Sequence, residues 1–210
     1  MGSILEALSP EQQIACSTQN NILLTACPGS GKTRTLTHRL AYQVLRDPAS
    51  KKIKIAITYT NRAAEEITNR LEGMNIDQSS IWAGTIHQFC MHFIIRPYAM
   101  YSKRLCKGYR IIDDYSKKAY GREIAERLGM HLNYYDDPFQ YENVRTEYKR
   151  VLKEKKEIDF DAILLISEEL LASCAFIGSN IASVISSILV DEFQDTNELQ
   201  YSILSTIYKA

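Results

Sequence analysis

The chain has 210 residues, 45% hydrophobic and 24% charged, a composition that fits a soluble globular protein and excludes a fibrous or disordered one. Lys and Arg together number 25, as do Asp and Glu, so any basic surface for a nucleic acid must be local. Five scattered cysteines without a C-x-x-C pair, no signal pattern and no apolar run of about 18 residues predict a cytoplasmic protein with reduced thiols and no membrane partner.

The first predicted elements are a helix, a strand and a second helix. Ser9 can cap a helix that begins at Pro10, and Gln12 can reach back to complete a capping box. Residues 21–26 form a short apolar run in front of a glycine-rich loop, which predicts a buried strand. From Lys32 to about residue 45, apolar side chains recur at helical spacing, so a helix should follow the loop.

Strands and helices continue to alternate after this helix. Residues 53–60 are rich in β-branched side chains and predict a second strand, and residues 61–71 predict the helix that follows it. Residues 80–84 predict a third strand, and residues 85–95 predict a helix that Pro97 closes.

The composition changes after the third strand. Residues 85–159 are rich in Tyr, Lys and Arg and are mostly helical in pattern, with residues 109–112 the only candidate strand. A helix over residues 160–173 and a buried strand over residues 186–190 then restore the earlier alternation. We therefore predict an α/β fold with a parallel sheet, in which a mostly helical insertion interrupts the core. The core would comprise residues 1–96 and 160–210, and the insertion residues 97–159.

Two groups of side chains in the insertion could contact a nucleic acid or could serve the fold alone. Tyr134, Tyr135 and Tyr141 could stack on bases, although such tyrosines more often pack in cores. A basic run is interspersed with glutamates, which favours a solvated helix with ion pairs at i,i+4 spacing. The basic residues of this run are Arg145, Lys149, Arg150, Lys153, Lys155 and Lys156.

The segment ACPGSGKT, residues 26–33, joins the first predicted strand to the second predicted helix. A glycine-rich loop in this position presents backbone N–H groups and a helix N-terminus to a chain of phosphates. Lys32 would reach the β- and γ-phosphates, and the hydroxyl of Thr33 would ligate Mg²⁺. The usual pattern begins with glycine where Ala26 stands here. The predicted nucleotide-binding residues are Ala26, Cys27, Pro28, Gly29, Ser30, Gly31, Lys32 and Thr33.

The segment ILVDEFQDTN, residues 188–197, ends a buried strand in acidic side chains. A strand of this kind beside a phosphate-binding loop supplies a carboxylate for Mg²⁺, and Asp191 is in that position. Glu192 can activate the attacking water as a general base. Asp195 has no assigned chemistry, and we expect it to cap a helix from Thr196 onward.

Several segments, in this order, resemble the motifs of UvrD/Rep-type superfamily 1 DNA helicases. They are ACPGSGKTRTLTHRL, TYTNRAAEEITNRL, GTIHQFC, FDAILL and ILVDEFQDTNELQY, and LSPEQ is similar to the family's upstream Q motif. The resemblance implies a RecA-like P-loop NTPase core (domain 1A) carrying an inserted helical subdomain (domain 1B). It also implies that ATP and Mg²⁺ are the cofactors.

The resemblance further implies roles for individual residues. Gln12 would recognise adenine, Arg34 would contact the nucleotide, and Gln194 would sense the γ-phosphate. Lys32, Glu192 and Gln194 would therefore be the catalytic residues, and Thr33 and Asp191 the metal ligands. The residues that match the single-stranded DNA motifs are Tyr59, Thr60, Asn61, Arg62, Thr85 and His87. In these motifs Tyr59, Arg62, Ile86 and Gln88 replace the family's usual Phe, Lys, Phe and Ser.

The function implied is ATP-driven 3′-to-5′ movement along single-stranded DNA or at a junction of single- and double-stranded DNA. Two alternatives remain open: a UvrD-like ATPase in a nuclease or defence complex, and a non-motor P-loop regulatory module. The family motifs that normally follow DEFQDTN are absent, so we expect a truncated core that lacks a central strand and the C-terminal helicase domains. Such a chain should be nearly inactive alone and should expose apolar surface around Ile203, Leu204 and Ile207. A nuclease or repair protein is a candidate partner.

Overall fold

The computed structural model describes residues 2–25, 27 and 29–210. The chain forms two compact units, each with its own core. The first unit comprises the described residues of Met1–Phe89 together with Gly178–Ala210, and the second comprises Cys90–Ile177. None of the helices in these described ranges has the length and apolar character needed to cross a membrane.

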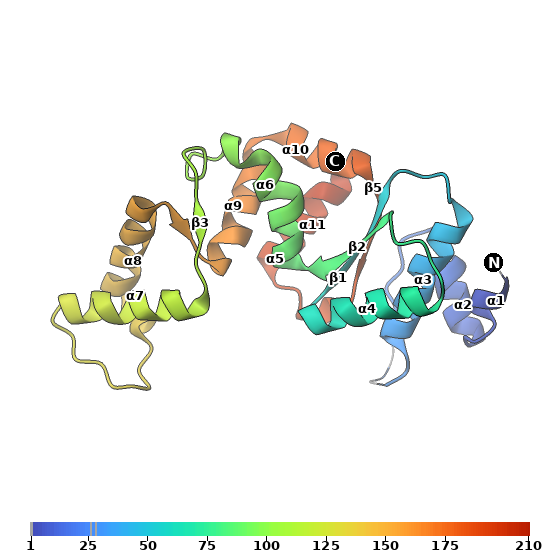
Figure 1. The fold of residues 1–210 in the computed structure, drawn as a ribbon, viewed down its shortest axis with the longest axis horizontal. Helices are drawn as coiled ribbons and strands as arrows, with labels where there is room; N and C mark the ends of the chain where they lie inside the picture. The colour runs from blue at the N-terminus through green and yellow to red at the C-terminus, as the bar shows by residue number, and fades with distance from the viewer. Residues whose placement is uncertain (1, 26, 28) are drawn as a thin grey trace. The chain divides into compact units, whose positions relative to one another are not determined.

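A three-stranded parallel sheet organises the first unit (Figure 1). Its strands are β1 (Ile53–Thr58), β2 (Ile81–Thr85) and β5 (Ile185–Val190), in the order β2-β1-β5. Ile57 of β1 is in register with Gly84 of β2 and with Val190 of β5, so the carboxyl ends of all three strands meet at one edge of the sheet. This arrangement confirms the predicted α/β class with a parallel sheet.

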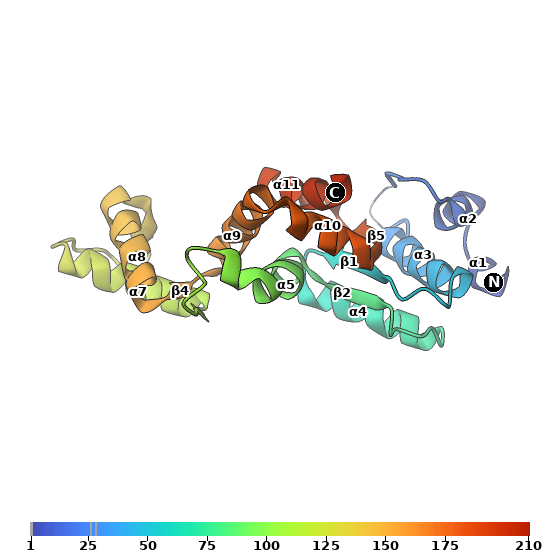
Figure 2. The ribbon, with the colours of Figure 1, turned by 90° about the horizontal axis from the view of Figure 1, so that it is seen from above.

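Helices cover both faces of this sheet, because its strands carry apolar side chains on both sides. The helix α4 lies on one side of the sheet and α11 on the other (Figures 1 and 2). A buried cluster joins α3 and α4 to β1 through Leu40, Ala56 and Ile67, all 0% exposed. The helices of this unit are α1 (Gly2–Leu5), α2 (Pro10–Ser17), α3 (Lys32–Arg46), α4 (Asn61–Gly73), α5 (Ile86–Phe89) and α11 (Glu198–Lys209).

The strand predicted over residues 21–26 is wrong for residues 21–25, and Ala26 lies outside the described residues. Residues 21–25 have no strand conformation, and the side chain of Leu23 is 74% exposed. A strand needs a partner for its backbone hydrogen bonds. Within the described part of the chain, β5 pairs only with β1, so no strand lies alongside residues 21–25 to form a ladder with them.

The apolar surface predicted on the last helix is also largely wrong. Ile203 and Ile207 of α11 are buried, with 0% and 2% exposure, and Leu204 is partly buried. The outward face of α11 instead carries Tyr201 and Tyr208, which are both exposed. The hydroxyl of Tyr208 accepts a 2.8 Å hydrogen bond from the side-chain amide of Asn21. The helix therefore buries Ile203 and Ile207, and its Tyr208 contacts Asn21 in the segment before the glycine-rich loop.

The second unit is mostly helical. A buried cluster that includes Ile124, Val144 and Leu152 joins α7 to α8, and the short strands β3 and β4 pair in parallel. Its elements are η1 (Cys90–Ile95), α6 (Arg96–Tyr98), η2 (Ala99–Tyr101), β3 (Arg110–Ile111), α7 (Asp114–Arg127), η3 (Pro138–Gln140), α8 (Glu142–Lys155), β4 (Glu157–Ile158), α9 (Phe160–Ser173) and the first residues of α10 (Ala175–Val184).

The two compact units do not coincide with the domains predicted from the sequence, and those domain boundaries stay a prediction. The sequence places residues 160–173 with the core, whereas the structure places the corresponding helix α9 in the second unit. The physical reason is that α9 packs on the helical segment η1 of the same unit. The residues predicted to form one helix over 85–95 also divide between the two units, with α5 in the first and η1 in the second.

Candidate functional site

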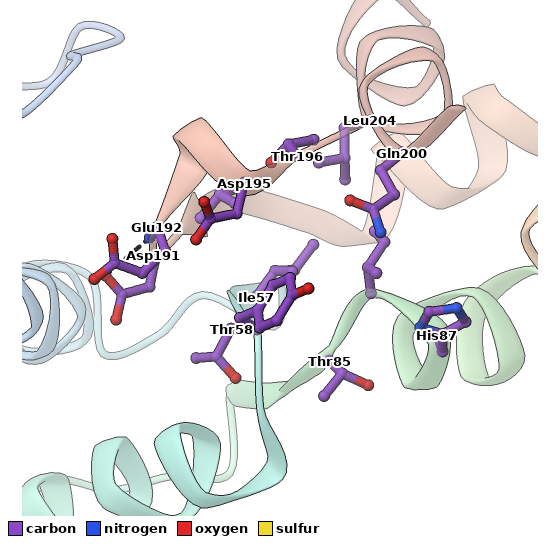
Figure 3. A pocket seen from close by; sticks show the side chains of 13 residues that line it. Ile57, Thr58, Thr85, His87, Asp191, Glu192, Asp195, Thr196, Gln200 and Leu204 are labelled. Atoms are coloured by element: carbon purple, nitrogen blue, oxygen red, sulfur yellow. Dashed lines mark hydrogen bonds between the residues drawn. The ribbon is translucent and has the colours of Figure 1, made fainter. Parts of the chain in front are cut away.

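A pocket of about 280 Å³ opens at the edge where the three strands of the first unit end (Figure 3). In open parallel sheets, ligands bind at this carboxyl edge because the loops there can be varied without disturbing the strands. Asp191, Glu192 and Asp195 gather on one side of the pocket, and His87 and Gln200 approach from another (Figure 3). The lining residues are Ile57, Thr58, Tyr59, Thr85, Ile86, His87, Val190, Asp191, Glu192, Asp195, Thr196, Gln200 and Leu204.

The last residue of the glycine-rich loop, Thr33, contacts this edge directly. The hydroxyl of Thr33, in the first turn of α3, lies 3.0 Å from a carboxylate oxygen of Asp191 and donates a hydrogen bond to it. The carboxylate is held in turn by the sheet, because the backbone N–H of Asp191 donates to the carbonyl of Ile57 at 2.8 Å. Two side chains predicted to share a metal ion are therefore brought together.

The conformation of the loop depends on its glycines. Gly29 and Gly31 have φ values of 79° and 91°, in the left-handed region that L-residues with a Cβ rarely adopt. Gly31 is the N-cap of the 15-residue helix α3 and provides no capping side chain, so the helix end keeps its positive potential for an anion. Cys27 and Ser30 are exposed, whereas the predicted loop residues Ala26 and Pro28 lie outside the described residues.

Gln12 and Arg34 connect the N-terminal segment to the loop. The side chain of Gln12 completes the predicted capping box of α2 with Ser9 and also donates a 3.1 Å hydrogen bond to the carbonyl of Ser30. Arg34 donates to the carbonyl of Ala7 at 2.9 Å. Both side chains therefore lie beside the loop, although each has a protein partner in this structure.

The backbone after β5 bends sharply at the acidic residues. Glu192 has a φ of 50°, a left-handed conformation that is uncommon for a residue other than glycine and is a recognised source of strain at functional sites. Its backbone N–H donates to the side chain of Asp191 at 3.1 Å. Its carboxylate accepts a hydrogen bond from the side-chain amide of Gln194. Asp191, Glu192 and Gln194 thus form one chain of contacts.

The helix cap predicted for Asp195 is wrong. The helix α11 begins at Glu198, and Asn197 is its N-cap, with Gln200 completing a capping box. Asp195 ends the short 3-10 helix η4 (Phe193–Asp195) and lines the pocket instead. Gln200 is a pocket residue that the sequence reasoning missed, although the spacing N-x-x-Q in residues 197–200 could have placed it at a helix start.

The residues that match DNA motifs divide into two groups. Tyr59, Thr85 and His87 line the pocket, and the ring of Tyr59 is 70% exposed at the end of β1. Thr60 caps α4 by accepting a hydrogen bond from the N–H of Ala63 at 3.2 Å. The other two members, Asn61 and Arg62, are exposed on the first turn of α4 and do not line the pocket.

The site fits a hydrated magnesium ion better than an ion enclosed by protein ligands. Among the described residues, no group of three or more His, Cys, Asp or Glu side chains could hold a metal. Mg²⁺ usually takes one or two carboxylates, keeps several waters and completes its shell with phosphate oxygens. Thr33 and Asp191, next to a loop suited to phosphates, provide that kind of donor set.

Comparison with known proteins identifies relatives that match almost the full length of this chain. Residues 8–138 and 129–210 match the UvrD/REP helicase N-terminal domain family. DNA helicase II of Escherichia coli (strain K12) is 27% identical over 228 residues, which cover 95% of this chain and 31% of that protein. The ATP-dependent DNA helicase PcrA of Leuconostoc citreum is 27% identical over 221 residues, covering 91% of this chain and 29% of that protein. The chain therefore spans about a third of the length of these relatives.

Proposed function

The chain belongs to the UvrD/REP helicase N-terminal domain family, and we propose that it is the ATP-binding segment of an ATP-dependent DNA helicase or translocase. In this proposal it binds single-stranded DNA, or a junction of single- and double-stranded DNA, and contributes to movement in the 3′-to-5′ direction. Residues 1–96 and 160–210 would form domain 1A, and residues 97–159 domain 1B. The observation that carries the proposal is the hydrogen bond between Thr33 and Asp191 at the edge of a pocket that Tyr59 also lines.

The proposed nucleotide site uses residues from two distant segments. The loop residues 26–33 would surround the phosphates of ATP, with Lys32 adding a positive charge near the β- and γ-phosphates. Thr33 and Asp191 would hold Mg²⁺, which supplies charge neutralisation at the phosphate oxygens when it is bound. Gln12 would recognise adenine, and Arg34 would contact the nucleotide. Their positions beside Ser30 and Gly31 support these roles.

Hydrolysis requires a base that is aimed at the γ-phosphate side of this site. Glu192 would accept a proton from the attacking water, and Asp191 next to it would stay bound to the metal. Gln194 donates a hydrogen bond to the carboxylate of Glu192, so it can orient that base and respond to the γ-phosphate. The base and its orienting group therefore come from one short turn.

Residues of the proposed nucleotide site and residues proposed to contact DNA line the same pocket, so ATP binding or hydrolysis could change the contact with DNA. Tyr59 presents an exposed ring that can stack on a base. Thr85 ends the neighbouring strand β2, and His87 lies on the helix α5 that follows it. The backbone N–H of Asp191 donates to the carbonyl of Ile57, two residues before Tyr59. A movement of the backbone at Asp191 and Glu192 would therefore displace Tyr59, the residue proposed to stack on a base. Asn61 and Arg62, on the first turn of α4, would contact the DNA backbone.

The decisive experiment measures two affinities of the same protein. A fluorescent ATP analogue with Mg²⁺ should bind the unmodified chain, and Lys32→Ala should remove that binding. Labelled single-stranded DNA should also bind, and Tyr59→Ala should weaken it by roughly 5- to 100-fold, since stacking on one base contributes about 1–3 kcal/mol. Nucleotide binding with no DNA binding would instead favour a non-motor nucleotide-dependent module.

A further inference from the structure

Three aromatic rings form a cluster at the surface of the second unit, and none of the three has been assigned a role above. Tyr98 of α6, Tyr101 of η2 and Phe176 at the start of α10 contact one another, with ring centroids 5.1–6.4 Å apart. Tyr101 is 56% exposed and Phe176 43% exposed, and the neighbouring Met100 is 76% exposed. Packing three rings together at the surface leaves an apolar patch that water solvates poorly, which is typical of a binding surface.

The segment that carries Tyr98 and Tyr101 has charged side chains of one sign. From residue 78 to residue 112 the sequence contains no Asp or Glu but contains five Lys or Arg residues. Four of them, Arg96, Lys103, Arg104 and Lys107, are exposed in the segment that carries Tyr98 and Tyr101. No ion pair among the residues that the structure describes involves any of these four.

The basic run on α8 provides an internal comparison. Arg150 there pairs with Glu147 and Glu154, and Arg127 of α7 also pairs with Glu147. Those guanidinium groups are already compensated by carboxylates, whereas the cations beside the aromatic patch are not. A surface that combines stacking rings with uncompensated cations matches a single-stranded nucleic acid, which presents flat bases and a phosphate chain together.

We propose that Tyr98, Tyr101 and Phe176, with Lys103 and Arg104, form a second contact for single-stranded nucleic acid on this chain. In this contact the rings stack on one or two bases, and the two cations bind the adjoining phosphates. The proposal rests on the proposed function, because it adds a contact to a protein that already binds DNA through Tyr59. It differs from that function in its residues, which all belong to the second unit.

The first test is photocrosslinking of the unmodified chain to oligothymidylate that contains 5-iododeoxyuridine, followed by mass spectrometry of the crosslinked peptides. We expect crosslinks to the peptide that holds Tyr98 and Tyr101 or to the peptide that holds Phe176, in addition to the Tyr59 peptide. Crosslinks to the Tyr59 peptide alone would overturn the second contact and leave the proposed function standing. No binding of the oligonucleotide at all would instead remove the proposed function.

The second test measures affinity for labelled oligothymidylate by fluorescence anisotropy. Tyr101→Ala should weaken binding by roughly 5- to 100-fold, and Tyr101→Phe, which keeps the ring, should restore it to within about twofold. Tyr115→Ala is the matched control, because Tyr115 is an 82% exposed tyrosine of the same unit but follows Asp113 and Asp114. That variant should bind as the unmodified chain does.

The third test addresses the charges. The combined variant Lys103→Gln and Arg104→Gln should reduce the slope of log affinity against log salt by about 0.7 for each phosphate that the variant no longer binds. An unchanged slope, together with normal affinity of Tyr101→Ala and Phe176→Ala, would refute the second contact and would indicate a protein-docking surface instead. Circular dichroism of each variant, compared with the unmodified chain, distinguishes weaker DNA binding from unfolding.

Discussion

The hydroxyl of Thr33 and the carboxylate of Asp191 are joined by a hydrogen bond of 3.0 Å between residues 158 positions apart in the sequence. One group sits on the first turn of α3 and the other directly after β5. Asp191 is fixed independently by its backbone bond to Ile57. The fold itself therefore brings the two proposed metal ligands together, which would reduce the reorganisation needed when a metal–nucleotide complex binds.

Removing the hydroxyl of Thr33 should weaken binding of the magnesium–nucleotide complex. A hydrogen bond or ligand contact to a charged group contributes about 1.5–3 kcal/mol, so Thr33→Ala should lower affinity by roughly 10- to 100-fold. Thr33→Ser keeps the hydroxyl and should bind within a few-fold of the unmodified chain. Titration of a fluorescent ATP analogue, with Mg²⁺ and then with EDTA, checks both results. If EDTA leaves the affinity of the unmodified chain unchanged, Thr33 and Asp191 do not hold a metal.

Replacing Glu192 should separate hydrolysis from binding. General-base catalysis contributes about 10²- to 10⁴-fold, so Glu192→Gln should lower the ATPase rate by that order and leave nucleotide affinity nearly unchanged. The control is Glu198→Gln, an exposed glutamate on the first turn of α11 that does not line the pocket. Because an arginine finger from a second domain supplies about 10³- to 10⁵-fold in related reactions, the rate of this chain alone should already be very low. Undiminished turnover in Glu192→Gln would disprove the role assigned to this base.

The sequence predicts those residues of the candidate site whose role depends only on their near neighbours in the chain. Gly29 and Gly31 were identifiable because only glycine adopts their left-handed backbone easily, and Asp191 because a buried strand rarely ends in acids. Their joining could be inferred only from the motif pair, since the sequence carries no direct record of a contact over 158 positions. The strand predicted at residues 21–25 failed because strand formation depends on a neighbouring strand, which is not a local property.

Gln200 and Asp195 line the pocket but were not predicted to do so, for a related reason. Gln200 reads locally as a helix-capping residue, and it is one, but the same turn also brings it to the pocket. Asp195 was assigned to a helix cap because acids are common there, whereas Asn197 occupies that position two residues later. The positive φ of Glu192 redirects the backbone at this point, and no residue type in the segment signals it. The type of most helices and strands could be predicted from the sequence, whereas the exact positions of the turns between them could not.

Adding one methyl group at Gly84 should destabilise the first unit. A Cβ at this position would lie 2.7 Å from the ring of Trp82 and 2.8 Å from the side-chain oxygen of Gln88, which already accepts a hydrogen bond from Thr85. Overpacking of this kind costs about 1–3 kcal/mol, so Gly84→Ala should lower the free energy of unfolding by that amount. Gly73→Ala is the matched control, because no atom lies within 4 Å of its added Cβ. Urea denaturation measures both, and equal stability of the two variants would contradict the close packing around Gly84.

The five cysteines should differ sharply in reactivity, and one should report nucleotide binding. Burial raises the pKa of the Cys90 thiol to about 12 and that of Cys16 to about 11, from an ordinary value of 9.0. The raised pKa lowers the thiolate fraction of Cys90 and of Cys16 at pH 8, and burial also blocks access, so iodoacetamide should spare both residues in the folded chain. Cys27 and Cys106 are exposed and should react. Mg²⁺–ATP should protect Cys27, which lies in the glycine-rich loop proposed to bind phosphates, and should leave Cys106 as reactive as before.

The same raised pKa fixes the sign of a pH effect on stability. Between about pH 9 and pH 12 the folded chain keeps the proton of Cys90 while the unfolded chain loses it, so unfolding releases a proton. The stabilisation is complete below pH 9 and declines as the pH rises toward 12, and Cys90→Ala should show a shallower decline than the unmodified chain. Urea denaturation at several alkaline pH values, with peptide mapping of alkylated thiols alongside, tests both statements. Labelling of Cys90 in the folded chain as fast as that of Cys106 would show that the thiol is neither buried nor held protonated.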